Sequence, residues 1–364
     1  MKIPILNIYY LLCYAWNFID EAETVVLKPE TFDGPVDLFA KVLNDGVARL
    51  ISRGLDRDYL VIQEDLRGIR GKLNLATTIK RNLLLNAKTN CSFDEFSYDI
   101  PQNQILKATL RNLTLVDSLN HDQKERSRNL YWRFTGVSNV RLTTKLFRTV
   151  RIHRNNRFYL FLMQICRIIH ENLLVNEIDG TVQFRDFRKD EARMGALFEK
   201  FVKTFCERHT QYKVTSPRID WFETSGSESD LRYLPNMETD IVLELAKRTI
   251  ILDTKFYSSP ITTNQYGKKR IKSDNLYQIF SYVTNWSLEH GKEDLEGWLL
   301  YAAVDDTFDY HYKIGGQTIR VCSIDLSQNW RKIEEDLLSI VDHKLRNDTV
   351  PNNLNANSPE LIVS

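Results

Sequence analysis

The stretch of this sequence best suited to chemistry is TDIVLELAKRTIILDTKFY, residues 239–257. Its apolar residues predict two buried strands joined by a tight turn, yet Asp240, Asp253 and Lys255 stand among them. Burying a carboxylate or an ammonium group without a partner costs several kcal/mol on the usual order-of-magnitude scale. These three residues are therefore expected to be kept either for mutual pairing or for catalysis.

Strand periodicity predicts how the three charges are arranged, because successive side chains of a strand point to opposite faces. A two-residue turn at 247–248 would place Asp240 opposite Lys255. The same register would set Val242 opposite Asp253. All three charged groups would then lie on one reactive face of the hairpin, and the other face would be dry.

Two carboxylates held close together repel each other unless a cation lies between them. Magnesium prefers carboxylate oxygens and keeps several water ligands, so Asp240 and Asp253 are predicted to bind Mg²⁺. Lys255 would orient a metal-bound water or stabilise the charge that develops on a phosphate. The pattern favours phosphodiester hydrolysis, whereas a structural Asp240–Lys255 salt bridge, the alternative, leaves Asp253 without a role.

These residues resemble the PD-(D/E)xK nuclease superfamily, which has an acid on one strand and Asp-x-Lys on the next. Thr239 stands where the motif has proline, although Pro235 lies nearby. In the preceding segment, Glu199 lies beside an apolar helical stripe, where such nucleases often carry a further acid. The resemblance implies that Glu199 is a third metal ligand, directly or through water. Gln278 and Tyr282 match the Q-x-x-x-Y helix of the RecB-like branch, which implies that Gln278 supports the site.

Four segments in order, NIYYLLCYAW, RGIRGK, LPNMETDI and DTKFY with NLYQIFSY, make the chain similar to the McrC family. McrC proteins are the nuclease subunits of McrBC restriction systems directed against 5-methylcytosine. The resemblance implies cleavage of double-stranded methylated DNA together with an McrB-like AAA+ GTPase hexamer, whose GTP hydrolysis the N-terminal part stimulates. It also allows an McrC–McrC contact in the assembled complex. The chain has no Walker motif, so GTP is expected on the partner.

The expected fold class is α/β, in two domains followed by a tail. An N-terminal mixed α+β domain, 1–175, would engage the GTPase partner. A PD-(D/E)xK nuclease domain, 176–345, would have a mixed sheet flanked by helices, and 346–364 would form a flexible tail. Two alternatives remain open, namely a non-catalytic adapter of an AAA+ ring and a free-standing RecB-like repair nuclease.

Three basic stretches are candidates for contacts with phosphates or acidic partners, and an ordinary solvated surface is the alternative for each. The run 141–157 contains six lysines and arginines and no acid. The other two stretches supply the proposed partner-binding cations Arg67, Arg70 and Lys72, and the proposed DNA-binding cations Lys268, Lys269, Arg270 and Lys272.

Composition sets looser limits. A formal net charge of +1 neither favours nor excludes a nucleic-acid partner, because a local basic patch can hide in a neutral total. Five cysteines without CxxC spacing predict reduced thiols, and no Cys–His cluster suggests zinc. The apolar run near the N-terminus is too short for a membrane span, so a cytoplasmic protein without membrane contact is expected.

Overall fold

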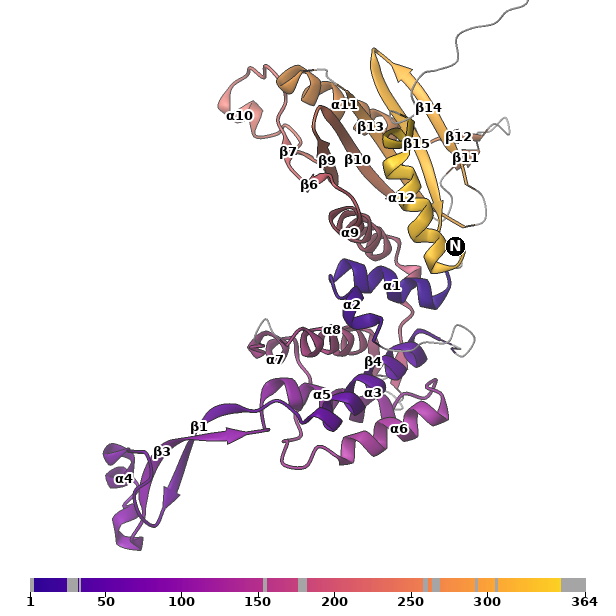
Figure 1. The fold of residues 1–364 in the computed structure, drawn as a ribbon. Coiled ribbons are helices and arrows are strands. Elements are labelled where there is room, and N and C mark those ends of the chain that lie inside the picture. The colour runs from indigo at the N-terminus through magenta and orange to yellow at the C-terminus, as the bar shows by residue number, and fades with distance from the viewer. Residues whose placement is uncertain are drawn as a thin grey trace, which may run out of the picture. The chain divides into compact units, whose positions relative to one another are not determined.

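The chain forms two compact units in the computed structural model (Figure 1). The sheet unit comprises Met1–Asn17 and Asp190–Ser364, and the arm unit comprises Phe18–Lys189. The residues that the structure describes are 3–24, 32, 34–152, 156–175, 182–257, 261–263, 269–291, 294–304 and 307–347. Most of the expected tail thus lies outside the described residues.

The sheet unit contains the charged hairpin. Its helices are α1 (Ile5–Ala15), α9 (Glu191–His209), α10 (Glu228–Leu231), α11 (Ser273–His290) and α12 (Trp330–Asn347). Its strands are β6 (Lys213–Thr215), β7 (Arg218–Ile219), β8 (Met237–Glu238), β9 (Ile241–Leu245), β10 (Arg248–Phe256), β11 (Ile261–Thr263), β12 (Lys269–Ile271), β13 (Leu295–Ala303), β14 (Asp309–Ile314) and β15 (Gln317–Asp325).

Six of these strands form one mixed sheet in the order β14-β15-β13-β10-β9-β6. Strands β10, β13 and β15 run parallel, while β9, β6 and β14 join antiparallel. Every residue of β13 is buried, as expected for an interior parallel strand covered on both faces. The predicted mixed α/β sheet with flanking helices is therefore confirmed.

Helices α11 and α9 cover opposite faces of the hairpin strands β9 and β10. On one face, Ile279 and Val283 of α11 belong to the same buried cluster as Ile251 of β10. On the other face, the Phe198 ring of α9 lies 6.4 Å from the Phe256 ring. Both faces of the hairpin are thus covered, because α11 packs over the face that carries Asp253 and Lys255.

The hairpin turn also differs from the prediction. Leu245 pairs with Arg248, so the turn residues are Ala246 and Lys247, and Ala246 adopts a left-handed φ of 51°. The ladder ends at Ile241 paired with Leu252, which brings the next residue, at position 240, level with position 253. The pairing expected between positions 240 and 255 is therefore wrong by two residues.

The first helix packs within the sheet unit, so the expected 1–175 domain does not match the division of the chain. In α1, Tyr14 packs edge-on against Phe201 of α9 at 5.4 Å and donates a 2.6 Å hydrogen bond to Glu334 of α12. Asn7 donates 2.8 Å hydrogen bonds to the backbone carbonyls of Leu326 and Gln328. These three hydrogen bonds join residues 319 to 321 positions apart in sequence, which periodicity cannot reveal.

The arm unit is mainly helical, with one long antiparallel ribbon. Its helices are α2 (Ile19–Ala22), α3 (Pro35–Arg53), α4 (Leu75–Lys80), α5 (Pro101–Thr114), α6 (His121–Trp132), α7 (Thr144–Thr149) and α8 (Arg157–Asn172), with 3-10 turns η1 (Leu83–Asn86) and η2 (Phe187–Lys189). Its strands are β1 (Asp58–Leu66), β2 (Lys72–Leu73), β3 (Thr89–Ser97), β4 (Leu173–Val175) and β5 (Val182–Phe184).

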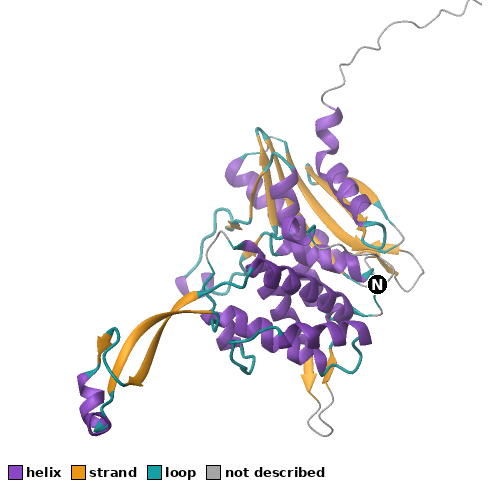
Figure 2. Cartoon of the chain, turned by 60° about the horizontal axis from the view of Figure 1, so that its bottom comes forward, coloured by secondary structure: helices purple, strands orange, loops and turns teal. Residues whose placement is uncertain are grey.

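Strands β1 and β3 pair along nine residues each, from Asp58 opposite Ser97 to Leu66 opposite Thr89. This ribbon, with β2 and α4 at its end, extends away from the helices of the same unit (Figure 1 and Figure 2). It is called the arm below.

Close approach between α11 and β13 predicts a stability effect at Gly297. A Cβ atom there would lie 2.5 Å from Val283 Cγ2 and 3.0 Å from Ile279 Cγ1, so Gly297→Ala should overpack this contact and cost about 1–3 kcal/mol. In α9, a Cβ at Gly195 would meet only Phe256 Cβ, at 3.9 Å, and Gly195→Ala should stabilise the chain by about 0.5–1 kcal/mol. Urea unfolding measures both, and equal effects of the two substitutions would contradict this packing.

Candidate functional site

The two acids of the hairpin lie side by side at the end of β9. Asp240 directly precedes β9, and its Oδ2 accepts hydrogen bonds from the backbone N–H and the hydroxyl of Thr254, each 2.8 Å long. Thr254 belongs to the neighbouring strand, β10, immediately after Asp253. The middle residue of Asp-Thr-Lys therefore holds the first acid in place, a role that sequence reasoning missed because the predicted register set the two apart.

The second acid is almost fully buried, since Asp253 is 1% exposed. Lys255 Nζ lies 2.6 Å from Asp253 Oδ2 and forms an ion pair with it. Neither carboxylate oxygen has another hydrogen-bond partner in the described part of the chain. Burial, helped by the charge of Asp240, raises the pKa of Asp253 to about 7, although Lys255 opposes the shift.

A chain of side chains holds the lysine. Lys255 Nζ donates to Gln278 Oε1 at 3.0 Å, and Gln278 Nε2 donates to the Tyr282 hydroxyl at 2.8 Å. That hydroxyl donates in turn to the Glu238 carbonyl at 3.1 Å. Burial alone would lower the pKa of Lys255, but the charges of Asp253 and Asp240 outweigh it and raise the pKa. The Gln and Tyr of the Q-x-x-x-Y pattern thus lie against the charged residues, and the ammonium stays protonated.

Glu199 of α9 lies close enough for the charges of Asp240 and Lys255 to shift its pKa. Burial raises its pKa first, and the charge of Asp240 raises it further, while Lys200, Lys203 and Lys255 act in the opposite direction. No three His, Cys, Asp or Glu side chains within the described ranges are grouped closely enough to hold a metal ion. Direct ligation by all three acids has no support in this arrangement, and ligation by Glu199 through water stays a prediction.

The predicted DNA-binding cations are only partly described. Lys268 lies outside the described residues, and the side chain of Lys269 is not described either. Arg270 is exposed. Lys272 is held beside the candidate site, because its ammonium lies 3.4 Å from the ring centroid of Tyr257, which follows the Asp-Thr-Lys strand.

The predicted partner-binding cations lie in the arm unit, next to β2. Arg67, Arg70 and Lys72 are all exposed, and the Arg70 guanidinium stacks 4.0 Å from the centroid of the Phe93 ring. Gly71 has a φ of 67°, and a Cβ there would lie 2.4 Å from the Ser92 carbonyl oxygen, so this turn requires glycine. The RGIRGK segment therefore forms a tight turn that exposes these three cations.

Comparison with known proteins identifies the family. Residues 10–302 match the family described as "McrBC 5-methylcytosine restriction system component". The chain belongs to the McrBC family. It is 35% identical over 345 residues to the Escherichia coli K12 protein called "Type IV methyl-directed restriction enzyme EcoKMcrBC", covering 94% of this chain and 99% of that one. The family resemblance read from the four sequence segments is confirmed.

A solved structure shares the fold of this McrBC family member. It is the "Refined half-complex from tetradecameric assembly of Thermococcus gammatolerans McrB AAA+ hexamers with bound McrC". The match has a TM-score of 0.59 at 16% identity and covers 94% of this chain and 76% of that one. At 16% identity, this similarity shows the fold alone.

Two further observations concern the chain as a whole. Among the described residues, no helix combines the length and apolar character that crossing a membrane requires. All five cysteines are buried, and no disulfide joins any of them.

The raised pKa of Asp253 predicts a pH-dependent stability difference. Because the native state binds this proton more tightly than the unfolded state, ionised Asp253 makes the metal-free protein less stable as pH rises from about 4 towards 7. Asp253→Asn has no carboxylate to ionise at this position. From pH 5 to pH 8 its free energy of unfolding should therefore rise relative to wild type by on the order of 2–3 kcal/mol. Urea unfolding in EDTA at both pH values tests the difference.

The matched control is Asp220→Asn, since Asp220 has an 85% exposed side chain in the same unit. Its stability relative to wild type should stay constant between the two pH values. A constant difference for Asp253→Asn as well would mean that Asp253 titrates as an ordinary surface acid.

Proposed function

We propose that this chain is the Mg²⁺-dependent DNA endonuclease subunit of a modification-dependent McrBC restriction complex acting in the cytoplasm. The observation that carries the proposal is the Asp253 carboxylate, buried beside Asp240 with no partner other than the Lys255 ammonium among the described residues. A structural ion pair would normally satisfy such a carboxylate with further hydrogen bonds. Two hard oxygen donors in an undersatisfied pair fit a small divalent cation.

Each residue of the site has a defined part in hydrolysis. Asp240, oriented by Thr254, and Asp253 would hold Mg²⁺. The bound metal supplies Lewis acidity and lowers the pKa of water, which makes a nucleophile available at neutral pH. Lys255 presents a charged donor to a phosphate oxygen beside the carboxylates and stabilises the negative charge that builds up there. Gln278 keeps that ammonium at the site, and Glu199 would bind a water of the metal.

The alternative of a non-catalytic adapter explains this arrangement less well. A partner-binding protein gains nothing from a protonated lysine and two acids under α11. A structural role would favour apolar replacements, because a buried ion pair contributes little net stability. The free-standing nuclease has no observation in its favour.

The first test removes the central acid. Asp253→Asn should reduce cleavage of methylated double-stranded DNA, assayed with an McrB-like partner, GTP and Mg²⁺, by about a hundredfold or more, because a metal ligand is lost. Mg²⁺ alone should raise the melting temperature of wild type, since a ligand that binds the native state stabilises it, and should raise that of Asp253→Asn far less.

Asp220→Asn is again the control, and it should cut DNA and respond to Mg²⁺ as wild type does. Undiminished cutting by Asp253→Asn would make the chain an adapter. Lost cutting with an unchanged Mg²⁺ response would remove the metal from the proposal while keeping the catalytic role of Asp253.

The partner in this proposal is an McrB-like AAA+ GTPase hexamer. The related solved complex contains McrB AAA+ hexamers with bound McrC, and the absence of a Walker motif here agrees with GTP binding by the partner. The exposed cations Arg67, Arg70 and Lys72 would contact the partner and stimulate its GTP hydrolysis, while cations around Lys272 would contact DNA phosphates. A second copy of the chain in the assembled complex would supply the cut on the opposite strand.

The arm cations are tested in the full chain by reversing their charge. Arg67→Glu, Arg70→Glu and Lys72→Glu combined should lower stimulation of GTP hydrolysis about tenfold or more, as expected when charge-assisted hydrogen bonds are lost. Arg128→Glu, another exposed arginine of the arm unit, serves as the control. Full stimulation by the triple variant would show that these cations belong to an ordinary solvated turn.

A further inference from the structure

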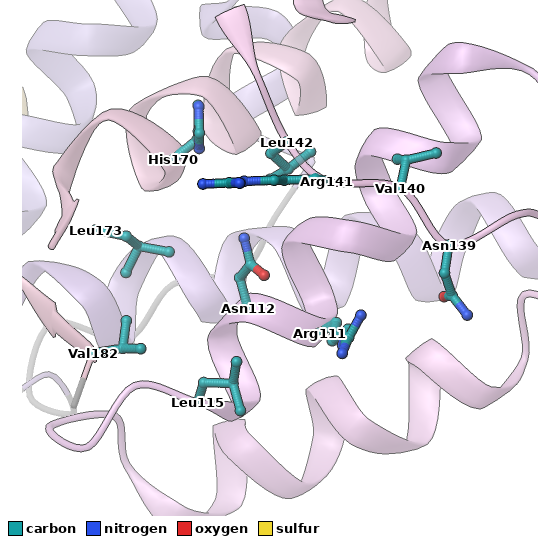
Figure 3. A pocket seen from close by; sticks show the side chains of 10 residues that line it. All are labelled: Arg111, Asn112, Leu115, Asn139, Val140, Arg141, Leu142, His170, Leu173 and Val182. Carbon is teal, nitrogen blue, oxygen red and sulfur yellow. The ribbon is translucent and has the colours of Figure 1, made fainter. Parts of the chain in front are cut away.

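The arm unit contains a cavity of about 440 Å³ that the nuclease proposal does not use. Figure 3 shows its walls, which come from the end of α5, the extended segment 139–142, the end of α8 and the start of β5. The volume falls within the roughly 300–1,000 Å³ typical of small-molecule sites. The segment 139–142 enters the basic run singled out in the sequence.

Two cations line the cavity. Arg111 and Arg141 both line it, and neither side chain makes an ion pair or hydrogen bond with any other described residue. None of the ten lining residues is acidic. In Figure 3 the Arg141 side chain extends between His170 and Asn112, and Arg141 and Arg111 are both exposed, so a ligand can reach their guanidinium groups from solvent. An unpaired guanidinium at a cavity wall favours an anion that accepts its hydrogen bonds.

Neighbouring side chains add fixed polar groups. The His170 ring stacks on Phe147 of α7 with centroids 5.6 Å apart, which holds it at the cavity wall. The carbonyl oxygen of Asn139 accepts a 3.0 Å hydrogen bond from Tyr131, so its NH₂ group is left to donate. Asn112 brings a second amide, and both amides line the same cavity.

The remaining wall is apolar, formed by residues such as Leu115, Leu173 and Val182. An inorganic anion would leave this apolar surface without an apolar group to pack against it. A ligand with an anionic end and a flat, less polar end would use both parts of the cavity. Arginine also binds phosphate bidentately and stacks on aromatic rings.

We propose that this cavity binds a nucleotide, with the phosphate on Arg141 and the base against the apolar wall. A free mononucleotide and a nucleotide of single-stranded DNA present the same chemistry. Exposed Lys145 and Arg148 of α7 follow Arg141 in the chain and would extend phosphate contacts in the second case. The proposal does not depend on the hairpin site or on cleavage.

The test measures binding of adenosine 5′-monophosphate to the full chain in EDTA by isothermal titration calorimetry. Wild type should bind it, and Arg141→Gln should weaken binding about tenfold or more, the loss expected for a charged hydrogen-bond partner. Leu115→Trp, at a 53% exposed position, should also weaken binding by filling the cavity. Arg128→Gln, outside the cavity, should bind as wild type does.

A single-stranded dodecamer of DNA then distinguishes the two sources. Displacement of the mononucleotide by the dodecamer would make DNA the ligand, and lack of displacement would leave a free nucleotide; either result supports the site. Circular dichroism and thermal unfolding establish that each variant is folded. The proposal is overturned if wild type binds neither ligand at millimolar concentration, or if Arg141→Gln binds as tightly as Arg128→Gln.

Discussion

Two carboxylates held beside each other inside the sheet unit place the strongest constraint on this structure. Asp240 and Asp253 lie at adjacent strand positions under α11, where their mutual repulsion and the cost of burial act together. The fold offsets this cost only in part. Thr254 satisfies Asp240 with two hydrogen bonds, and Lys255 pairs with Asp253, yet the pKa of Asp253 remains raised to about 7. A site that retains such unfavourable charge is typical of catalysis rather than of structural stabilisation.

The arrangement around the acids depends on how α11 packs on the sheet. Gly297 of β13 lets Ile279 and Val283 approach the strand closely, and the same helix carries Gln278 and Tyr282 on its way past the lysine. The hydrogen-bond chain from Lys255 through Gln278 and Tyr282 ends on the backbone of β8. The position of the ammonium is therefore determined by the packing of a whole helix, and the lysine does not need to order itself when substrate arrives.

The division into two units separates the chemistry of this McrBC family member from its other basic surfaces. The acids and the lysine belong to the sheet unit, whereas the arm cations and the arginine-lined cavity belong to the arm unit. The N-terminal segment that carried part of the family resemblance packs within the sheet unit, where Tyr9, Leu11 and Cys13 are fully buried. In the structure this segment therefore serves packing, and only our proposal assigns the partner-binding role to the arm.

Local patterns in the sequence indicated a candidate chemistry and the class of fold. Strand alternation assigned the three charged residues to one side, the Asp-Thr-Lys and Gln-x-x-x-Tyr patterns indicated the candidate site, and the resemblance to the nuclease superfamily implied the mixed sheet. Tertiary structure decided the rest. The hairpin register depends on a left-handed Ala246, a residue type that does not signal such a turn, and with it came the role of Thr254. The place of α1 and the cavity around Arg141 rest on contacts between distant segments, which no local periodicity encodes.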